Sequence, residues 1–171
     1  LASLNLLQFR DAASGQFDIA SFEHAVRLWT IVLEISVMMA QFPSKEIARR
    51  SFEYRTLGLG FANIGGLLMT SGIPYDSKEG RAICGALTAI MTGTAYATSA
   101  EMAKELGPFP GFAKNREPML RVMRKHRDAV RRIEAAHVPI DLLQAAKQTW
   151  DEVVELGDGA GEEDLAAVGG V

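Results

Sequence analysis

Apolar residues recur at steps of three and four along most of the chain, and this spacing constrains the fold more than any other feature of the sequence. Phe22, Val26, Trp29 and Leu33, for example, follow this spacing. Such a repeat is typical of amphipathic helices, whereas strands alternate every second residue. The pattern predicts helices at residues 19–42, from 44, at 61–70, from 76 or 77 to 106, at 117–136 and at 141–156.

Proline and glycine mark the expected ends of these helices. Pro43 is expected to end the first, because proline lacks the N–H that a helix interior requires. Gly157 is expected to stop the last helix, and the glycine- and acid-rich residues 157–171 are expected to form a flexible tail. The best strand candidate is 54–59, so the predicted fold class is mainly α with one or two short strands.

The longest expected helix contains several small residues in its interior. Gly85 and Gly93 are among them, and a glycine inside a helix costs about 0.5–1 kcal/mol relative to alanine. Close packing against a neighbouring element is the expected compensation.

Composition excludes several classes of protein. A single cysteine, Cys84, rules out an intramolecular disulfide framework, and we interpret it as a small buried residue in preference to a nucleophile. A net charge of −3 argues against a general nucleic-acid-binding surface. The longest apolar stretch, 28–40, is interrupted by Glu34 and is shorter than the roughly 20 residues of a membrane span. We therefore expect a cytoplasmic chain. The sequence opens on the apolar stretch LASLNLL without a Met or a basic segment, so we also expect no signal peptide and a chain cut from a longer protein.

A glycine-rich segment at 56–66 lies where a strand is expected to turn into a helix. A dinucleotide-binding fingerprint requires its third glycine three positions after the second, but the next glycine after Gly60 is Gly65. Two interpretations remain open: the glycines let a strand and a helix pack closely, or they line a ligand pocket with backbone. Neither a phosphate-loop lysine nor a zinc-binding His-Glu-x-x-His occurs, so no metal ligands are predicted.

Basic residues are concentrated in one expected helix. Eight of the 18 Lys and Arg residues lie in this segment: Lys114, Arg116, Arg121, Arg124, Lys125, Arg127, Arg131 and Arg132. No aromatic residue is interleaved with them, which disfavours a nucleic-acid-binding helix. A solvated helix face is the simpler interpretation, and a rim that attracts an anionic nucleotide or a partner subunit is the alternative.

Several long runs of sequence resemble the adenosylcobalamin-dependent (class II) ribonucleotide reductases. They are LASLNL at 1–6, FEYRTLGLGFANIGGLLM at 52–69, GIPYDSKEGRA at 72–82 and TSAEMAKELGPFPGFAKNREPM at 98–119. The resemblance covers residues 1–156, whereas 157–171 do not resemble the family.

This resemblance implies an enzyme that replaces the ribose 2′-hydroxyl of a ribonucleotide with hydrogen, giving deoxyribonucleotides for DNA synthesis. It implies adenosylcobalamin as cofactor and a thiyl radical on a cysteine of an Asn-x-Cys-x-Glu loop. It further implies a cysteine pair re-reduced by a thioredoxin-like partner, a nucleotide effector, a homodimer and a ten-stranded α/β barrel. None of the mechanistic cysteines corresponds to Cys84, so the isolated chain is expected to be inactive.

By resemblance, four residues are expected to lie nearest the chemistry and to contribute to cofactor binding: Arg55, Gly58, Gly60 and Asn63. The reason is that ligand sites in barrels gather where strands give way to helices. The alternative hypothesis, from a different class, is a non-catalytic helical interaction module whose basic helix binds an anionic partner.

Overall fold

A computed structural model describes residues 1–159 of the chain, which are mainly helical. Two short strands, two 3-10 helices and six α-helices follow one another. In chain order they are β1 (Ala2–Asn5), η1 (Leu6–Phe9), α1 (Ile19–Met39), α2 (Lys45–Tyr54), β2 (Leu59–Ala62), α3 (Ile64–Thr70), α4 (Lys78–Leu106), α5 (Phe112–Val130), η2 (Ala135–His137) and α6 (Ile140–Gly159). No helix in this part of the chain has both the length and the apolar character needed to cross a membrane.

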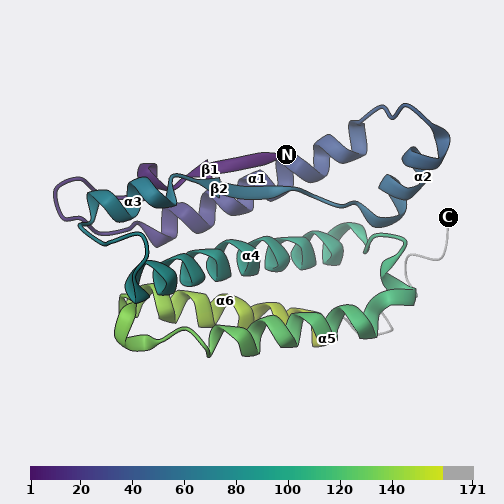
Figure 1. Ribbon diagram of the computed structural model, residues 1–171. Helices are drawn as coiled ribbons and strands as arrows, with labels where there is room; N and C mark the ends of the chain where they lie inside the picture. The colour runs from purple at the N-terminus through teal and green to yellow at the C-terminus, as the bar shows by residue number, and fades with distance from the viewer. Residues whose placement is uncertain (160–171) are drawn as a thin grey trace.

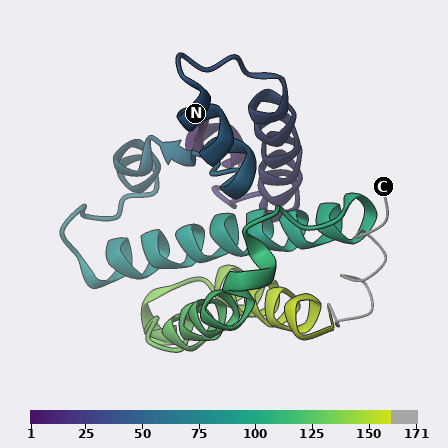
Figure 2. The same cartoon turned by 90° about the vertical axis from the view of Figure 1, so that its right-hand side faces the viewer.

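The central element is α4, which lies between two layers (Figure 1). On one side it packs against α1, which lies beside the strands, and on the other side against α6, which pairs with α5. A view from the side shows α1 and α3 on opposite sides of the two strands (Figure 2). Ala86, Leu87 and Ile90 of α4 are completely buried, so the apolar core follows this helix.

Close packing between α4 and α6 confirms the expectation from the small residues. A Cβ atom added to Gly93 would lie 2.7 Å from Thr149 Cγ2 on α6. Real Cβ atoms do not approach that closely, so the two helices approach each other here only because residue 93 lacks a side chain.

The two strands form a parallel sheet in which Ala2 pairs with Leu59 and Asn5 with Ala62. The expected strand at 54–59 is therefore displaced: Tyr54 ends α2, and β2 begins only at Leu59. Helix α2 begins after Ser44, whose Oγ accepts from the Ile47 N–H at 3.3 Å, and it ends where Arg55 adopts the left-handed conformation. No strand was expected at 2–5, because its partner strand lies more than fifty residues away in the sequence.

Other helix boundaries also differ from those expected. Helix α1 ends at Met39, before Pro43, and α5 occupies Phe112–Val130, not 117–136. Gly157 does not stop α6, which runs to Gly159. A Cβ atom on Gly157 would lie 2.6 Å from Leu120 Cδ2 of α5, so this glycine permits close helix packing. The expected flexible tail beyond residue 159 lies outside the described residues.

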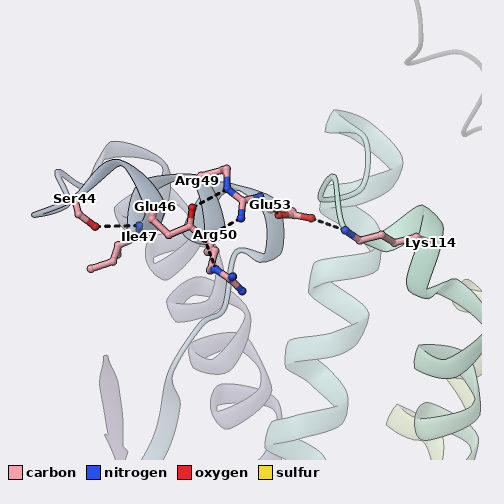
Figure 3. A network of polar contacts seen from close by, with 7 residues as sticks. All are labelled: Ser44, Glu46, Ile47, Arg49, Arg50, Glu53 and Lys114. Carbon is pink, nitrogen blue, oxygen red and sulfur yellow. Dashed lines mark hydrogen bonds and ion pairs between the residues drawn. The ribbon is translucent and has the colours of Figure 1, made fainter.

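An ion-pair network holds α2 together and joins it to α5 (Figure 3). Glu46 accepts hydrogen bonds from Arg49 and Arg50, which lower the pKa of its carboxyl to about 2. Glu53 at the other end of α2 binds Lys114 of α5 at 2.5 Å. Because these side chains are mostly exposed, the network orients α2 more than it stabilises the fold.

Candidate functional site

The carboxyl ends of the two parallel strands bring two asparagines together. Asn63 Nδ2 donates a hydrogen bond to Asn5 Oδ1 at 2.8 Å, and both residues are exposed. Asn63 follows β2 directly and adopts the left-handed conformation, with φ 68°. Ligands of open parallel sheets bind outside the carboxyl ends of the strands. These two amides therefore lie at the edge of the sheet where such a ligand would bind.

Arg55 precedes the amino end of β2, the end opposite to Asn63. This residue ends α2 in the left-handed conformation, with φ 45° and ψ 49°. Its Nη1 donates to Glu34 Oε1 of α1 at 2.8 Å, and its guanidinium lies 5.4 Å from the centre of the Phe52 ring. Only 21% of the Arg55 side chain and 13% of the Glu34 side chain are exposed. The charge of Arg55 is therefore already matched within the chain.

A pocket of about 410 Å³ lies beside this ion pair, between α1, α4 and the segment that leads into β2. Glu34, Arg55 and Tyr96 contribute polar groups, whereas Met91 and Met102 of α4 contribute apolar surface. Mixed lining of this kind, with few polar groups among apolar ones, is usual for small-molecule sites.

One face of the sheet is composed of small and polar residues. Pairing sets Ser3 beside Gly60 and Asn5 beside Ala62, while Leu4 and Phe61 on the other face belong to or pack against the core. A Cβ atom added at Gly60 would make only an ordinary contact of 3.7 Å with Ser3 Oγ. Since Gly60 has no positive φ, neither backbone conformation nor crowding within the described residues requires a glycine there.

Gly58 differs from Gly60 in its surroundings. A Cβ atom at this position would lie 2.8 Å from Leu1 Cδ1, the flexible end of a side chain. Its carbonyl accepts a hydrogen bond from the Ala2 N–H at 2.9 Å, just before the two strands begin to pair. Gly58 therefore belongs to the amino end of the sheet.

The four residues predicted from the sequence are thus spread along β2 and its two ends, and they do not form a cluster. Gly58 and Arg55 precede β2, Gly60 lies within it, and Asn63 follows it. A strand of four residues spans about 13 Å, which separates the two ends. Two polar partners, Asn5 and Glu34, were missed. As the only charge in the apolar stretch 28–40, Glu34 could have been singled out, whereas nothing in the sequence distinguished Asn5.

The remaining candidates from the sequence lie away from the sheet. Cys84 is half-buried within α4, and its backbone carbonyl accepts from the Thr88 hydroxyl at 2.7 Å. On the basic helix, Lys114 binds Glu53 and Arg124 binds Asp158. Within residues 1–159 no three His, Cys, Asp or Glu side chains come together as a metal site.

A second, more polar groove of about 620 Å³ lies between α1, α4 and α6. Burial raises the pKa of Glu23 in this groove, and the nearby Glu152 raises it further. Arg27 of α1 binds Glu101 of α4 across the same groove.

Comparison with known proteins connects these features to one family. Residues 1–163 match the family model described as ribonucleotide reductase, barrel domain. The chain is 65% identical to the vitamin B12-dependent ribonucleotide reductase of Agrobacterium fabrum and 58% identical to that of Bradyrhizobium diazoefficiens. Each alignment covers 92% of this chain and 14% of the relative. The protein of that name from Rhodopirellula baltica is 46% identical over the same share of this chain and 15% of its own length.

The matched residues include both strands, the segment from Arg55 to Asn63 between α2 and α3, and the whole of the central helix α4. The chain spans about one seventh of the length of its first two relatives, so the sheet and its pockets represent one region of a longer type of protein. On this agreement of sequence over nearly its whole length, the chain belongs to the ribonucleotide reductase barrel-domain family.

Proposed function

We propose that the chain is part of a vitamin B12-dependent ribonucleotide reductase that makes deoxyribonucleotides for DNA synthesis. The observation that carries this proposal is the 65% identity, over 92% of the chain, to a relative of that name. The reaction is reduction at the ribose 2′-carbon, with a cysteine pair as electron donor and a disulfide as its oxidised product. The name of a Mycobacterium tuberculosis relative, 30% identical over 68% of the chain, supports a ribonucleoside diphosphate as substrate.

The two strands support placement within a larger barrel. Among the described residues β1 and β2 pair only with each other, and they do so in parallel. Parallel strands occur almost exclusively within larger sheets covered on both faces, because their crossovers place helices there. A ten-stranded α/β barrel would supply the missing neighbours on both outer edges.

The sulfur chemistry of this proposal lies outside the chain. Cys84 is half-buried in α4, away from the sheet, so it supplies neither the thiyl radical nor the redox pair. The isolated chain is therefore inactive. In the whole enzyme a thioredoxin-like protein re-reduces the cysteine pair, a nucleotide effector and a homodimer are further expectations, and the site of action is the cytoplasm.

Adenosylcobalamin is the cofactor we propose for the whole enzyme, since the relatives are named for vitamin B12. The described residues do not fit it as an enclosing site. Pockets of roughly 300–1,000 Å³ suit drug-sized ligands, and the pocket of about 410 Å³ beside Arg55 is far too small for a corrinoid with its nucleotide arm. The open sheet face with Gly58 and Gly60, ending at Asn63, remains available as one wall of a larger site.

The decisive experiment uses the full-length protein that contains these residues. Conversion of a ribonucleoside diphosphate should require added adenosylcobalamin and a dithiol, and the purified chain of 171 residues should give no product under the same conditions. Turnover that is independent of the cobalamin would contradict the cofactor assignment, and turnover by the chain alone would contradict the placement of the cysteines.

The alternative, a helical module that binds an anionic partner through α5, is not favoured. Its basic residues include Lys114 and Arg124, which already bind acidic side chains of α2 and α6. The relatives are named as reductases and not as binding modules.

A further inference from the structure

Helix α1 carries apolar residues on two faces, only one of which is buried. Phe22, Val26, Thr30 and Leu33 face the core. A second row, which we call the α1 stripe, consists of Leu28 (49% exposed), Val32 (46%), Ile35 (49%) and Met39 (77%). A helix that is apolar all round is normally buried all round, so the α1 stripe is not an ordinary solvent face.

Charge supports the same conclusion. Between residues 28 and 39 the only charged side chain is Glu34, and it turns inward to bind Arg55 at 2.8 Å. The residues that flank the stripe, including Trp29, Ser36 and Met38, are uncharged. Helices that pair in water usually carry charged residues beside the apolar seam. The lack of charged residues beside the α1 stripe therefore indicates that its partner belongs to a folded core.

The spacing of the stripe specifies the shape of that partner. Its steps are four, three and four residues, which is the spacing of the apolar seam in paired helices that cross at a shallow angle. A second helix can therefore lie along α1 with its own apolar residues set between Leu28, Val32, Ile35 and Met39.

The size of the stripe distinguishes between a second copy and another part of the same polypeptide. The four exposed side chains of the stripe offer on the order of 400 Å², whereas a stable interface takes about 800 Å² from each partner. Within one polypeptide a contact of this size suffices, because the effective concentration of the two surfaces is high. The chain spans 14% of its first relatives, which leaves ample sequence for such a helix.

We propose that an apolar helix of the full-length polypeptide, from outside residues 1–171, packs along the α1 stripe. The proposal rests on the proposed function only in that the chain is one region of a longer reductase. It assigns α1 to an interior layer of the whole protein, with helices on both sides.

Thiol labelling in the full-length protein tests this. Ile35→Cys places a thiol on the stripe, and Leu33→Cys, on the core face of the same helix and 6% exposed, provides the buried reference. A polar maleimide is added to native and to urea-unfolded protein, and the rate is read at residue 35 or 33 by peptide mass spectrometry, which separates it from native cysteines. We expect both thiols to react about 100-fold more slowly in the native protein than in the unfolded one.

Labelling of the Ile35→Cys thiol within a few-fold of the unfolded rate would overturn the proposal. Protection that disappears on dilution, or a disulfide that joins the introduced thiols of two polypeptides, would identify a second copy as the partner and would also overturn it. Reductase activity is measured separately on the unmodified protein. Loss of the functional proposal therefore leaves the labelling result readable, and the reverse holds too.

Discussion

Asn63 and Asn5 connect the carboxyl ends of β2 and β1 through a single side-chain hydrogen bond of 2.8 Å. Asn63 makes this contact from a left-handed backbone, with φ 68°. Asparagine tolerates that conformation better than most residues, but β-branched residues do not. The pair therefore combines local backbone conformation with the register of the sheet.

Substitutions at Asn63 should separate these two contributions. Asn63→Gly keeps the backbone and loses only an exposed hydrogen bond, so we expect a loss of about 0.5–1 kcal/mol in the free energy of unfolding. Asn63→Val adds the strain of a β-branched residue, about 1–2 kcal/mol more. Urea unfolding of the purified chain measures both. Equal losses would show that the left-handed backbone is not retained in solution.

Two glycines of α4 should respond to alanine in opposite directions. Gly93→Ala sets a Cβ atom 2.7 Å from Thr149 Cγ2, and such overpacking costs about 1–3 kcal/mol. Gly85→Ala meets only Ile133 at 3.6 Å, so its better helix propensity should stabilise the chain by about 0.5–1 kcal/mol. Thermal unfolding monitored by circular dichroism distinguishes them. A stabilising Gly93→Ala would mean that α6 lies further from α4 than described.

The ion pair between Glu34 and Arg55 should contribute more to the free energy of unfolding than an exposed ion pair does. Glu34→Gln leaves a largely buried guanidinium without its carboxylate, and we expect a loss of about 2 kcal/mol. A double-mutant cycle with Arg55→Gln should give a coupling energy above about 1 kcal/mol. The matched control is Arg81 with Asp76, whose side chains are 63% and 94% exposed, and whose coupling should fall below about 0.5 kcal/mol. Similar coupling in the two pairs would contradict the burial of Arg55.

Gly60 offers a test of function that does not depend on stability. Because its added Cβ would make an ordinary 3.7 Å contact with Ser3, Gly60→Ala should leave the fold of the full-length protein unchanged. If the open sheet face lines the site of the whole enzyme, turnover should nevertheless fall, by about tenfold for a group misplaced by one methyl. Gly85→Ala, on the far side of α4, serves as the control that should retain activity. Unchanged turnover in Gly60→Ala would show that the sheet face at residue 60 does not line the site.

Acidification should weaken α2 through Glu46. The hydrogen bonds from Arg49 and Arg50 lower the pKa of this carboxyl to about 2, below its ordinary value of 4.5. A lowered pKa means that the contribution of the pair is complete above pH 4.5 and is lost as the pH falls towards 2. Carboxyl chemical shifts from an NMR titration should show the low pKa, and Arg49→Gln with Arg50→Gln should return it towards 4.5. A pKa near 4.5 in the unchanged chain would show that the pairs do not persist in solution.

Part of the fold was predictable because helices are local structures. The pattern predicted a helix from 76 or 77 to 106, and α4 occupies Lys78–Leu106. The prediction that Gly157 ends the last helix was wrong, because a glycine signals a helix end only when close packing does not require it. Here α6 continues past Gly157 to Gly159, and the glycine permits close packing because Leu120 of α5 lies where a side chain would be.

The positions of the strands and of the site residues depended on partners that are distant in the sequence. The predicted strand at 54–59 was displaced to Leu59–Ala62, because pairing with Ala2–Asn5 fixes where β2 begins. Arg55 was expected beside the other site residues, yet it lies at the opposite end of β2 from Asn63 and binds Glu34. No local pattern records these partners, which are distant in sequence.

The sequence by itself determined that the chain is mainly helical, where most of its helices lie, and to which family of enzymes it is related, because periodicity and long runs of identical residues are properties of contiguous sequence. Only the tertiary structure decided the parallel register of β1 and β2, the Asn5–Asn63 and Glu34–Arg55 partnerships and the second apolar face of α1. Those features depend on free energies of contact between segments that the chain must first bring together in space.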